Sequence, residues 1–313
     1  MSSASDHTCG FVAILGPPNA GKSTLLNHLV GQKVAIVTPK PQTTRNQITG
    51  ILSRPGLQMV FLDTPGIHRP LSDMNSLFVH VAWQALEAAD AALMVCDAHL
   101  AVTKPRAFWA EIELLQARMS NLDIFLGIAL NKTDLIRNKN ELIPVISSLR
   151  SAFPRAEIIP ISASTGDNTE HMLQILAQHL PASPALYPED QLSTLPLRFL
   201  CTEILREKLF LSLDRELPYM TAVGIELWNE DPQRALTTIH AVIYVPKQSH
   251  KGIIIGKKGS RLKEVGRRAR LELEDLLDMQ VNLQLWVKIK PGWTEDQPFI
   301  LQFLPELVSG GPL

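Results

Sequence analysis

Short apolar segments alternate with segments of helical periodicity along the first 180 residues of the chain. Several apolar segments have no polar interruption, which is typical of strands that crossover helices bury on both faces. The predicted strands are 11–15, 57–63, 91–97, 124–130 and 157–161. The predicted helices are 22–30, 76–89, 106–119, 141–152 and 168–180. This alternation predicts a doubly wound α/β domain with a mostly parallel sheet.

The pattern changes after a proline-rich segment that has no helical period. We assign residues 1–180 to a first domain, 181–196 to a linker, 197–293 to a second domain and 294–313 to a C-terminal tail. In the second domain a helix, two strands, two helices and a strand are predicted in that order, at 197–211, 221–228, 239–245, on either side of 256–259, and at 281–290. Helices and strands no longer alternate regularly, so we expect a smaller α+β unit.

The charge balance and the cysteines limit the classes of protein to consider. Thirty basic and 31 acidic side chains give a net charge of −1, so nucleic-acid binding would depend on a local basic patch. Cys9, Cys96 and Cys201 are far apart, which argues against a disulfide framework or a cysteine zinc site and favours a reducing compartment. Neither a signal peptide nor an apolar run of the roughly 18 residues that span a bilayer is recognisable. We therefore expect a cytoplasmic protein.

The sequence GPPNAGKS at 16–23 fits the pattern G-x-x-x-x-G-K-[ST] between a predicted strand and a predicted helix. Gly16 and Gly21 allow the backbone N–H groups to face phosphate. Lys22 is expected to reach the β- and γ-phosphates, and the Ser23 hydroxyl to bind Mg²⁺. This loop predicts nucleotide binding.

Two further segments are expected to meet the same phosphates. DTPG at 63–66 ends a predicted strand, where Asp63 can hold the Mg²⁺ shell, through water, and the Gly66 N–H can meet the γ-phosphate. The polar segment KPQTTRNQ at 40–47 resembles a loop that orders around Mg²⁺ and needs a threonine ligand. Either Thr43 or Thr44 could supply it, and the sequence does not choose between them.

The sequence NKTD at 131–134 predicts the base. Asn131 can bond the N7 side of a purine, and the Asp134 carboxylate can accept from both the N1–H and the exocyclic amine of guanine. Adenine would leave that carboxylate unpaired, and such sites discriminate strongly. The segment SAS at 162–164 can add a backbone N–H to the guanine carbonyl. Taken in order, the motifs predict a GTPase.

A second glycine-lysine loop, IIIGKKGS at 253–260, is too short for a nucleotide loop. It fits the GXXG loop of K-homology (KH) domains, which clamps about four nucleotides of a single strand. The order of elements around it resembles the type II version. Basic side chains are concentrated from Lys247 to Arg270, with Glu264 as the one acid among them. We expect RNA binding by Ile254, Gly256, Lys257, Lys258, Gly259, Arg261 and Lys263.

Two other functions compete with a GTPase switch that controls RNA engagement. An RNA-binding scaffold could carry a nucleotide in a catalytically idle front domain, and a small-molecule kinase could use the same phosphate loop. The guanine motif and the lack of an evident acceptor-substrate lid argue against the kinase. A GTPase assay with and without RNA separates the switch from the scaffold.

The chain resembles the Era family of TRAFAC-class GTPases. The resemblance is carried by GPPNAGKSTLLN, KPQTTR, DTPGIH, NKTD, ISAS, YPED, REKL, ELPY and LQLWVKIKPGW. It implies binding to the 3′ end of small-subunit ribosomal RNA, assistance to assembly of the small ribosomal subunit, a monomer, and peripheral contact with the cytoplasmic face of the inner membrane. The chain departs from the family at Pro17 (usually Arg), at Ala20 (usually Val) and in its tail, which lacks the usual ending.

The same resemblance bears on hydrolysis. Ras-like enzymes carry a water-orienting Gln where this chain has Ile67, so slow intrinsic turnover on the order of 10⁻⁴ s⁻¹ or somewhat faster is expected. Asn19 corresponds to the residue with which related GTPases coordinate K⁺. The resemblance therefore implies K⁺ as a cofactor beside Mg²⁺.

The expected catalytic residues are Lys22, Thr43, Thr44, Asp63 and Gly66. The expected GTP-binding residues are Gly16, Pro17, Pro18, Asn19, Ala20, Gly21, Lys22, Ser23, Thr24, Asp63, Thr64, Pro65, Gly66, Ile67, Asn131, Lys132, Thr133, Asp134, Ser162, Ala163 and Ser164. The expected metal ligands are Ser23, Thr43 or Thr44, and Asp63 for Mg²⁺, and Asn19 for K⁺.

Overall fold

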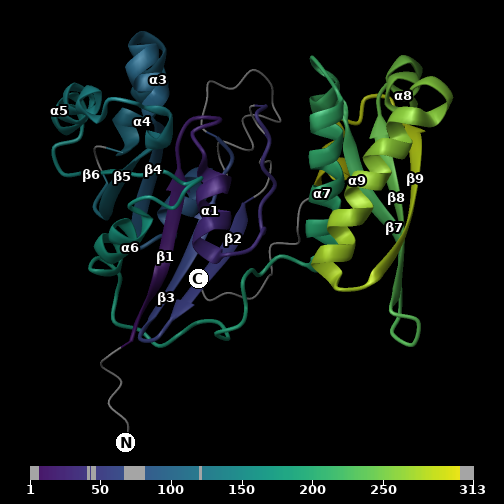
Figure 1. Cartoon of the computed structure of the whole chain (residues 1–313), viewed down its shortest axis with the longest axis horizontal. Coiled ribbons are helices and arrows are strands. Elements are labelled where there is room, and N and C mark those ends of the chain that lie inside the picture. Colours follow the sequence, from purple (N-terminus) through teal and green to yellow (C-terminus); the bar gives the residue numbers. More distant parts are fainter. Residues whose placement is uncertain (1–6, 41–42, 44–46, 67–81, 120–121, 304–313) are drawn as a thin grey trace, which may run out of the picture. The chain divides into compact units, whose positions relative to one another are not determined.

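The computed structural model describes residues 7–40, 43, 47–66, 82–119 and 122–303 (Figure 1). It divides into two compact units, Met1–Thr194 and Leu195–Leu313. No helix in the described part of the chain is both long enough and apolar enough to span a membrane.

The first unit is built on a six-stranded sheet with the order β2-β3-β1-β4-β5-β6. Only β2 runs antiparallel to its neighbour. The strands are β1 (Thr8–Leu15), β2 (Ile48–Arg54), β3 (Leu57–Asp63), β4 (Ala91–Asp97), β5 (Phe125–Asn131) and β6 (Glu157–Pro160). The predicted mostly parallel sheet is confirmed, and β2 is a strand that the sequence analysis missed.

Helices cover both faces of this sheet (Figure 1). The helices are α1 (Lys22–Val30), α3 (Ala98–Thr103), α4 (Pro105–Met119), α5 (Leu142–Ala152) and α6 (Thr169–Ala177). One face packs on α3, α4 and α5 in a core that includes Phe108, Ile112 and Leu149. Of the predicted helix 76–89, residues 82–87 are helical and 76–81 lie outside the described residues. The short helix α3 was not predicted.

The order in which strands are added to the sheet reverses at β1. This strand lies between β3 and β4. The chain places β2 and β3 on one side of β1 and then β4, β5 and β6 on the other side. Ligands of doubly wound sheets bind outside the carboxyl ends of the strands at such a point. The loop at 16–21, which follows β1, therefore lies where a ligand is expected.

The segment predicted as a linker is bound to the first unit over much of its length. The Gln58 Oε1 atom accepts from the backbone N–H groups of Leu186 and Tyr187 at 2.8 and 3.0 Å. The Ile51 N–H donates to the Leu192 carbonyl at 2.9 Å. The Nε2 atom of Gln58 donates to the Tyr187 carbonyl at 2.8 Å, so both polar ends of this buried side chain are satisfied and residues 186–192 pack along β2 and β3.

The second unit has a three-stranded sheet with β8 (Leu236–Val245) in the middle. β8 is antiparallel to β7 (Ala222–Asp231) and parallel to β9 (Gln280–Ile289). Its helices are α7 (Leu197–Ser212), α8 (Gln248–Ile255), α9 (Ser260–Leu277) and α10 (Gln297–Leu301). Residues of α7, α8 and α9 share one core with the strands. The predicted element order is confirmed, with α10 as an addition.

Candidate functional site

The loop after β1 is fixed by close backbone approaches at two glycines. Gly16 and Gly21 have φ values of 142° and 98°. A side chain at Gly16 would collide with the Val95 carbonyl, and one at Gly21 with the Asn131 amide. Glycine is therefore required at both positions, as the phosphate-loop motif predicts.

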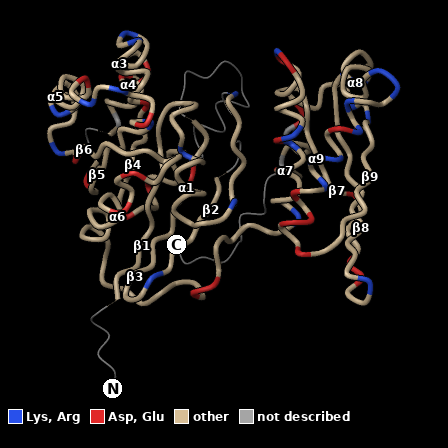
Figure 2. Tube along the Cα trace, in the orientation of Figure 1, with Lys and Arg blue, Asp and Glu red and all other residues tan. Residues whose placement is uncertain are grey.

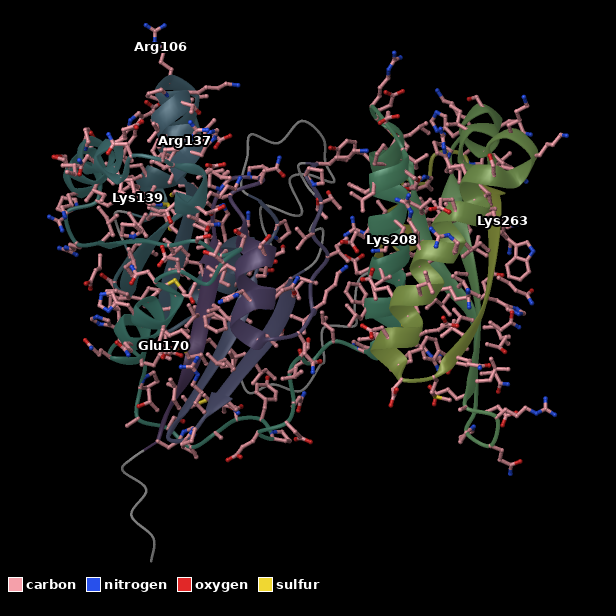
Figure 3. The ribbon with its side chains drawn as sticks, viewed as in Figure 1. Arg106, Arg137, Lys139, Glu170, Lys208 and Lys263 are labelled. Carbon is pink, nitrogen blue, oxygen red and sulfur yellow. The ribbon has the colours of Figure 1, made fainter. Side chains whose placement is uncertain are left out.

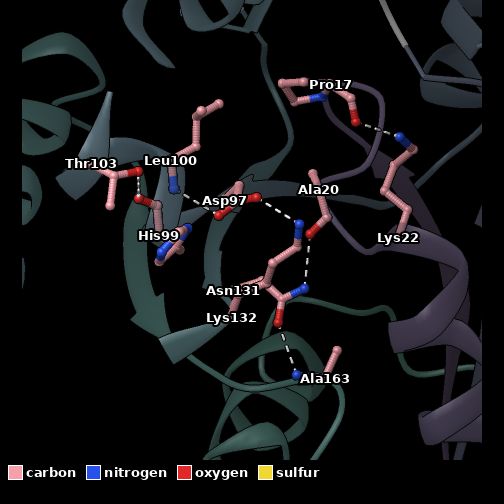
Figure 4. Close-up of polar contacts among 10 residues, drawn as sticks. All are labelled: Pro17, Ala20, Lys22, Asp97, His99, Leu100, Thr103, Asn131, Lys132 and Ala163. Carbon is pink, nitrogen blue, oxygen red and sulfur yellow. Dashed lines mark hydrogen bonds and ion pairs between the residues drawn. The ribbon is translucent and has the colours of Figure 1, made fainter. Parts of the chain in front are cut away.

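Lys22, the first residue of α1, lies folded across this loop. Its buried ammonium donates to the Gly16 carbonyl at 3.0 Å and to the Pro17 carbonyl at 2.9 Å, and Figure 4 shows the second of these bonds. Burial lowers the pKa of Lys22 to about 8. A buried cation held against this loop is suited to bind an anionic group such as phosphate.

Asp63 ends β3 opposite the start of α1. The Ser23 hydroxyl donates to its Oδ2 atom at 2.6 Å, whereas Oδ1 is buried and has no hydrogen-bond partner among the described residues. Burial raises the pKa of Asp63 to about 6. An unsatisfied buried carboxylate oxygen beside a serine hydroxyl fits a divalent cation that prefers oxygen ligands, such as Mg²⁺.

The residues after Asp63 pack against the first loop. The Thr64 hydroxyl donates to the Ile14 carbonyl at 2.9 Å. A Cβ on Gly66 would lie 2.9 Å from the Cα and N atoms of Pro18. Pro65 joins these two anchored residues, so the predicted γ-phosphate segment contacts the phosphate loop directly. Ile67, the next residue, lies outside the described residues.

A cavity of about 470 Å³ opens beside this loop. Of the expected residues, its walls contain Pro18, Asn19, Gly21, Lys22, Ser23, Thr24, Thr43, Gly66 and Lys132. Its walls also contain residues 36–39, which the sequence analysis did not select. Thr43 is buried and donates to the Lys40 carbonyl at 2.8 Å. Thr44 lies outside the described residues, so the alternative between these threonines stays open.

Asn131 ties the loops of the predicted base site together. Its amide donates to the Ala20 carbonyl at 2.8 Å and accepts from the Ala163 N–H at 2.8 Å (Figure 4). Thr133 donates to the Ile161 carbonyl at 2.9 Å. The phosphate loop and the loops after β5 and β6 are thereby held in one arrangement.

Asp134 and Lys132 extend from this arrangement. The buried Ser162 hydroxyl donates to Oδ1 of the exposed Asp134 at 2.7 Å and lies 3.2 Å from the Ser164 hydroxyl. Lys132 has a φ of 66° and pairs with Asp97 at 2.6 Å. The structure therefore brings all the guanine-site residues that the sequence predicted to the carboxyl ends of β5 and β6.

The second glycine-lysine loop joins α8 to α9 in the other unit. Gly256 ends α8 with a φ of 72°, and a Cβ there would lie 2.8 Å from Cβ of Arg261. Nothing lies within 4 Å of the corresponding position on Gly259. Lys257 and Lys258 are exposed and have no acidic partner among the described residues. Two cations at the tip of a turn (Figure 2) are suited to contact a phosphate backbone.

The other residues of the predicted RNA site differ in exposure and in the contacts that they already make within the protein. Lys263 is exposed on α9 (Figure 3). Arg261 donates to the Ile253 carbonyl at 2.8 Å and so closes the end of α8. Ile254 is fully buried in the core, whereas its neighbour Ile253 is exposed, so RNA binding at Ile254 stays a prediction. Three basic residues of α9, at 267, 268 and 270, pair with Glu264 or Glu274.

Comparison with known proteins identifies both units. Residues 11–132 match a family model described as 50S ribosome-binding GTPase, and residues 216–294 match a KH domain model. The chain is 50% identical over 295 residues to GTPase Era of Nitratidesulfovibrio vulgaris (strain DSM 19637 / Miyazaki F), covering 94% of this chain and 96% of the relative. The chain belongs to the GTPase Era family. It is also 42% identical to GTPase Era of Pseudomonas fluorescens (strain Pf0-1), covering 95% and 96% of the two chains.

Solved structures of Era are similar over both units. The crystal structure of Era in complex with MgGDPNP and nucleotides 1506–1542 of 16S ribosomal RNA has a TM-score of 0.89 and 39% sequence identity, covering 95% of this chain and 98% of that chain. As an Era-family member, this chain is a GTPase that hydrolyses GTP to GDP and phosphate. Membership decides against both the kinase and the idle scaffold.

The sequence analysis of this Era-family chain missed one charged residue of the site. Asp97 is the last residue of β4, the strand beside β5, and contacts Lys132. A carboxylate at the carboxyl end of a strand predicted to be parallel was the signal that could have revealed it.

Proposed function

We propose that the cavity beside the loop at 16–21 binds GTP with Mg²⁺. Lys22 would contact the β- and γ-phosphates, and Ser23, Asp63 and Thr43 or Thr44 would hold the ion directly or through water. Bound Mg²⁺ would neutralise charge that develops on the phosphates during transfer. The observation that carries this proposal is the buried Asp63 Oδ1 atom, which has no hydrogen-bond partner in the described part of the chain, on the carboxylate whose Oδ2 atom accepts from Ser23. A complex of Era with MgGDPNP supports it.

We propose further that Asn131 and Asp134 select guanine. The Asn131 amide has two N–H groups. One donates to the Ala20 carbonyl, so the other can donate to N7 of the base. Asp134 is exposed and retains acceptor capacity beside its bond from Ser162. The backbone of 162–164 would meet the guanine carbonyl. K⁺ at Asn19 is proposed on the resemblance and on the exposed position of this side chain in the cavity wall.

The loop at 256–259 is proposed to bind single-stranded RNA at the 3′ end of small-subunit ribosomal RNA. The support is the pair of exposed lysines at the loop tip and the relative in complex with nucleotides 1506–1542 of 16S ribosomal RNA. The description of the matching family model names the 50S subunit, but that model covers only residues 11–132. The Era structure with 16S ribosomal RNA is similar over both units, so it is the stronger guide to the RNA partner. Assistance to small-subunit assembly follows from this choice. The cytoplasmic location, the monomer and the contact with the inner membrane stay predictions.

One experiment tests the proposed RNA partner. We would measure binding of the protein to an oligonucleotide with the 3′-terminal sequence of the small-subunit RNA and to the same bases in scrambled order. We expect tighter binding of the first oligonucleotide and an effect of that RNA on the rate of Mg²⁺-dependent GTP hydrolysis. Equal affinity for both oligonucleotides at physiological salt would contradict the proposal.

A further inference from the structure

An ion pair joins the base loop to the neighbouring strand. Asp97 ends β4 and lies in register with Asn131, the last residue of β5. Lys132 follows with a left-handed backbone conformation, φ 66°, and its ammonium lies 2.6 Å from Oδ2 of Asp97 (Figure 4). The conformation is uncommon for a lysine, so the local fold directs this side chain toward β4.

The carboxylate of Asp97 is itself held in place. Its Oδ1 atom accepts from the Leu100 N–H at 2.9 Å and caps the amino end of α3. The side chains of Lys132 and Asp97 are 28% and 19% exposed, so solvent screens their attraction only in part. One oxygen therefore binds the helix and the other binds the ammonium.

The ion pair fixes a side chain that lines the cavity. Lys132 is part of the cavity wall together with Asn19 and Gly21. A lysine without a partner would have to give up side-chain conformational freedom when a ligand covers it, which weakens binding. With its ammonium held by Asp97, the apolar stem of Lys132 is ordered before the ligand arrives.

We propose that Asp97 is a positioning residue that holds the Lys132 stem ready to lie against the face of the nucleobase. Asp97 acts through Lys132 and does not touch the nucleotide. The stem contacts a purine face of any identity, whereas Asp134 distinguishes guanine by its hydrogen bonds. This inference rests on the proposed function, because it takes the cavity to be the guanine nucleotide site.

The test compares GDP with IDP, whose base lacks the 2-amino group. Asp97→Asn keeps the size of the side chain and the ability to cap α3, and removes the charge. We expect dissociation constants for GDP and IDP to rise by the same factor, roughly three- to tenfold at low salt. The GDP/IDP affinity ratio should stay at the wild-type value, and the loss should shrink as salt rises.

A double-mutant cycle identifies the route of the effect. Lys132→Met keeps an apolar stem without the ammonium, so Asp97→Asn in that background should cause no further loss. Asp123→Asn is the matched control, because it removes an exposed charge just before β5, at the opposite end of that strand. Should Asp97→Asn not fold, Asp97→Ser takes its place, since serine also caps helices.

Three outcomes would overturn the proposal: unchanged affinities in Asp97→Asn, an equal further loss in the Lys132→Met background, or a collapse of the GDP/IDP ratio. The last would mean that Asp97 only keeps the loop folded. Failure of the wild-type protein to bind GDP, or to prefer it to IDP, would instead contradict the proposed guanine site. The two failures are therefore distinguishable.

Discussion

Single residues of the nucleotide site are held in conformations that ordinary residues avoid. Asn19 and Lys132 have φ values of 61° and 66°, and Asn131 satisfies both ends of its amide within the protein. The two positive φ values cost free energy, which contacts such as the Asn131 hydrogen bonds offset, and such costs concentrate at functional sites. Changes at this scale are expected to alter nucleotide choice more than the fold.

Asp134→Asn is expected to change the base preference of the site from guanine to xanthine. The new amide can donate to the 2-oxo group of xanthine, but its single oxygen can no longer accept from both the guanine N1–H and the guanine amine. The loss of a charge-assisted pair should cost about 2–3 kcal/mol of GTP binding free energy. Calorimetry with GTP and xanthosine triphosphate measures both effects, and Asp190→Asn is a control for the charge change. Wild-type affinity for GTP in Asp134→Asn would reject the assignment.

Asn19→Gly tests the K⁺ site. Glycine adopts the positive φ of this position readily, whereas alanine would add backbone strain unrelated to the ion. Hydrolysis by the wild type should be faster in KCl than in NaCl at equal ionic strength, and Asn19→Gly should remove that difference. Nucleotide affinity should stay within about tenfold, because one neutral ligand is a small part of the site. Equal wild-type rates in the two salts would exclude the role.

At the scale of elements, the contact of α1 with β2 depends on a glycine. A Cβ on Gly50 would collide with Leu26 and Val30 of α1. Gly50→Ala is expected to lower the free energy of unfolding by about 1–3 kcal/mol through overpacking. Gly127→Ala in β5 is the control, because its Cβ would have ordinary contacts of 3.4 Å or more. Urea denaturation measures both, and equal stabilities would show that α1 shifts without cost.

The sequence predicted two buried strands at their observed bounds, but it did not predict the edge strand β2 or the short helix α3. Leu57–Asp63 and Ala91–Asp97 were predicted at their observed bounds, because buried strands have continuous apolar runs. Ile48–Arg54 was missed because this edge strand includes Gly50, Ser53 and Arg54 and follows a polar loop. α3 has six residues, too few to show helical periodicity. The Asp97 contact depends on strand order, which periodicity does not contain.

At the scale of the whole molecule, the two glycine-lysine loops belong to two units, each with its own core. Motif spacing predicted this division, because each loop is local in sequence. It did not predict that Ile254 is buried or that Arg261 closes α8, because both depend on how α8 packs. The positions of the bound linker residues likewise depend on Gln58, a polar residue whose burial no pattern indicated.

Changing both Lys257 and Lys258 to Asp should separate the two functions. Repulsion would replace attraction at the RNA backbone, so affinity for single-stranded RNA should fall steeply, and less so at high salt. Asp tolerates the positive φ of 52° at position 258, so the loop should fold. GTP affinity and hydrolysis without RNA should stay near wild type, as measured by fluorescence anisotropy and phosphate release.

The matched control changes Lys104 and Arg106 to Asp, because both are exposed at the start of α4 in the first unit (Figure 3 labels Arg106). It makes the same change in net charge and should leave RNA affinity unaltered. Full RNA affinity after the change at 257 and 258 would refute RNA binding by the loop at 256–259. Loss of GTP binding by the folded protein would mean that the two loops share one ligand.

The buried thiols make this chain a convenient background for site-specific dyes. Cys9, Cys96 and Cys201 are all buried, and burial raises the pKa of each thiol, to about 12 for Cys201. Maleimides react with the thiolate, so the native cysteines should label slowly in the folded protein. A new cysteine on the surface of each unit would accept a donor and an acceptor fluorophore with no prior cysteine removal. Energy transfer between them would then follow the two units through a cycle of GTP hydrolysis in single molecules.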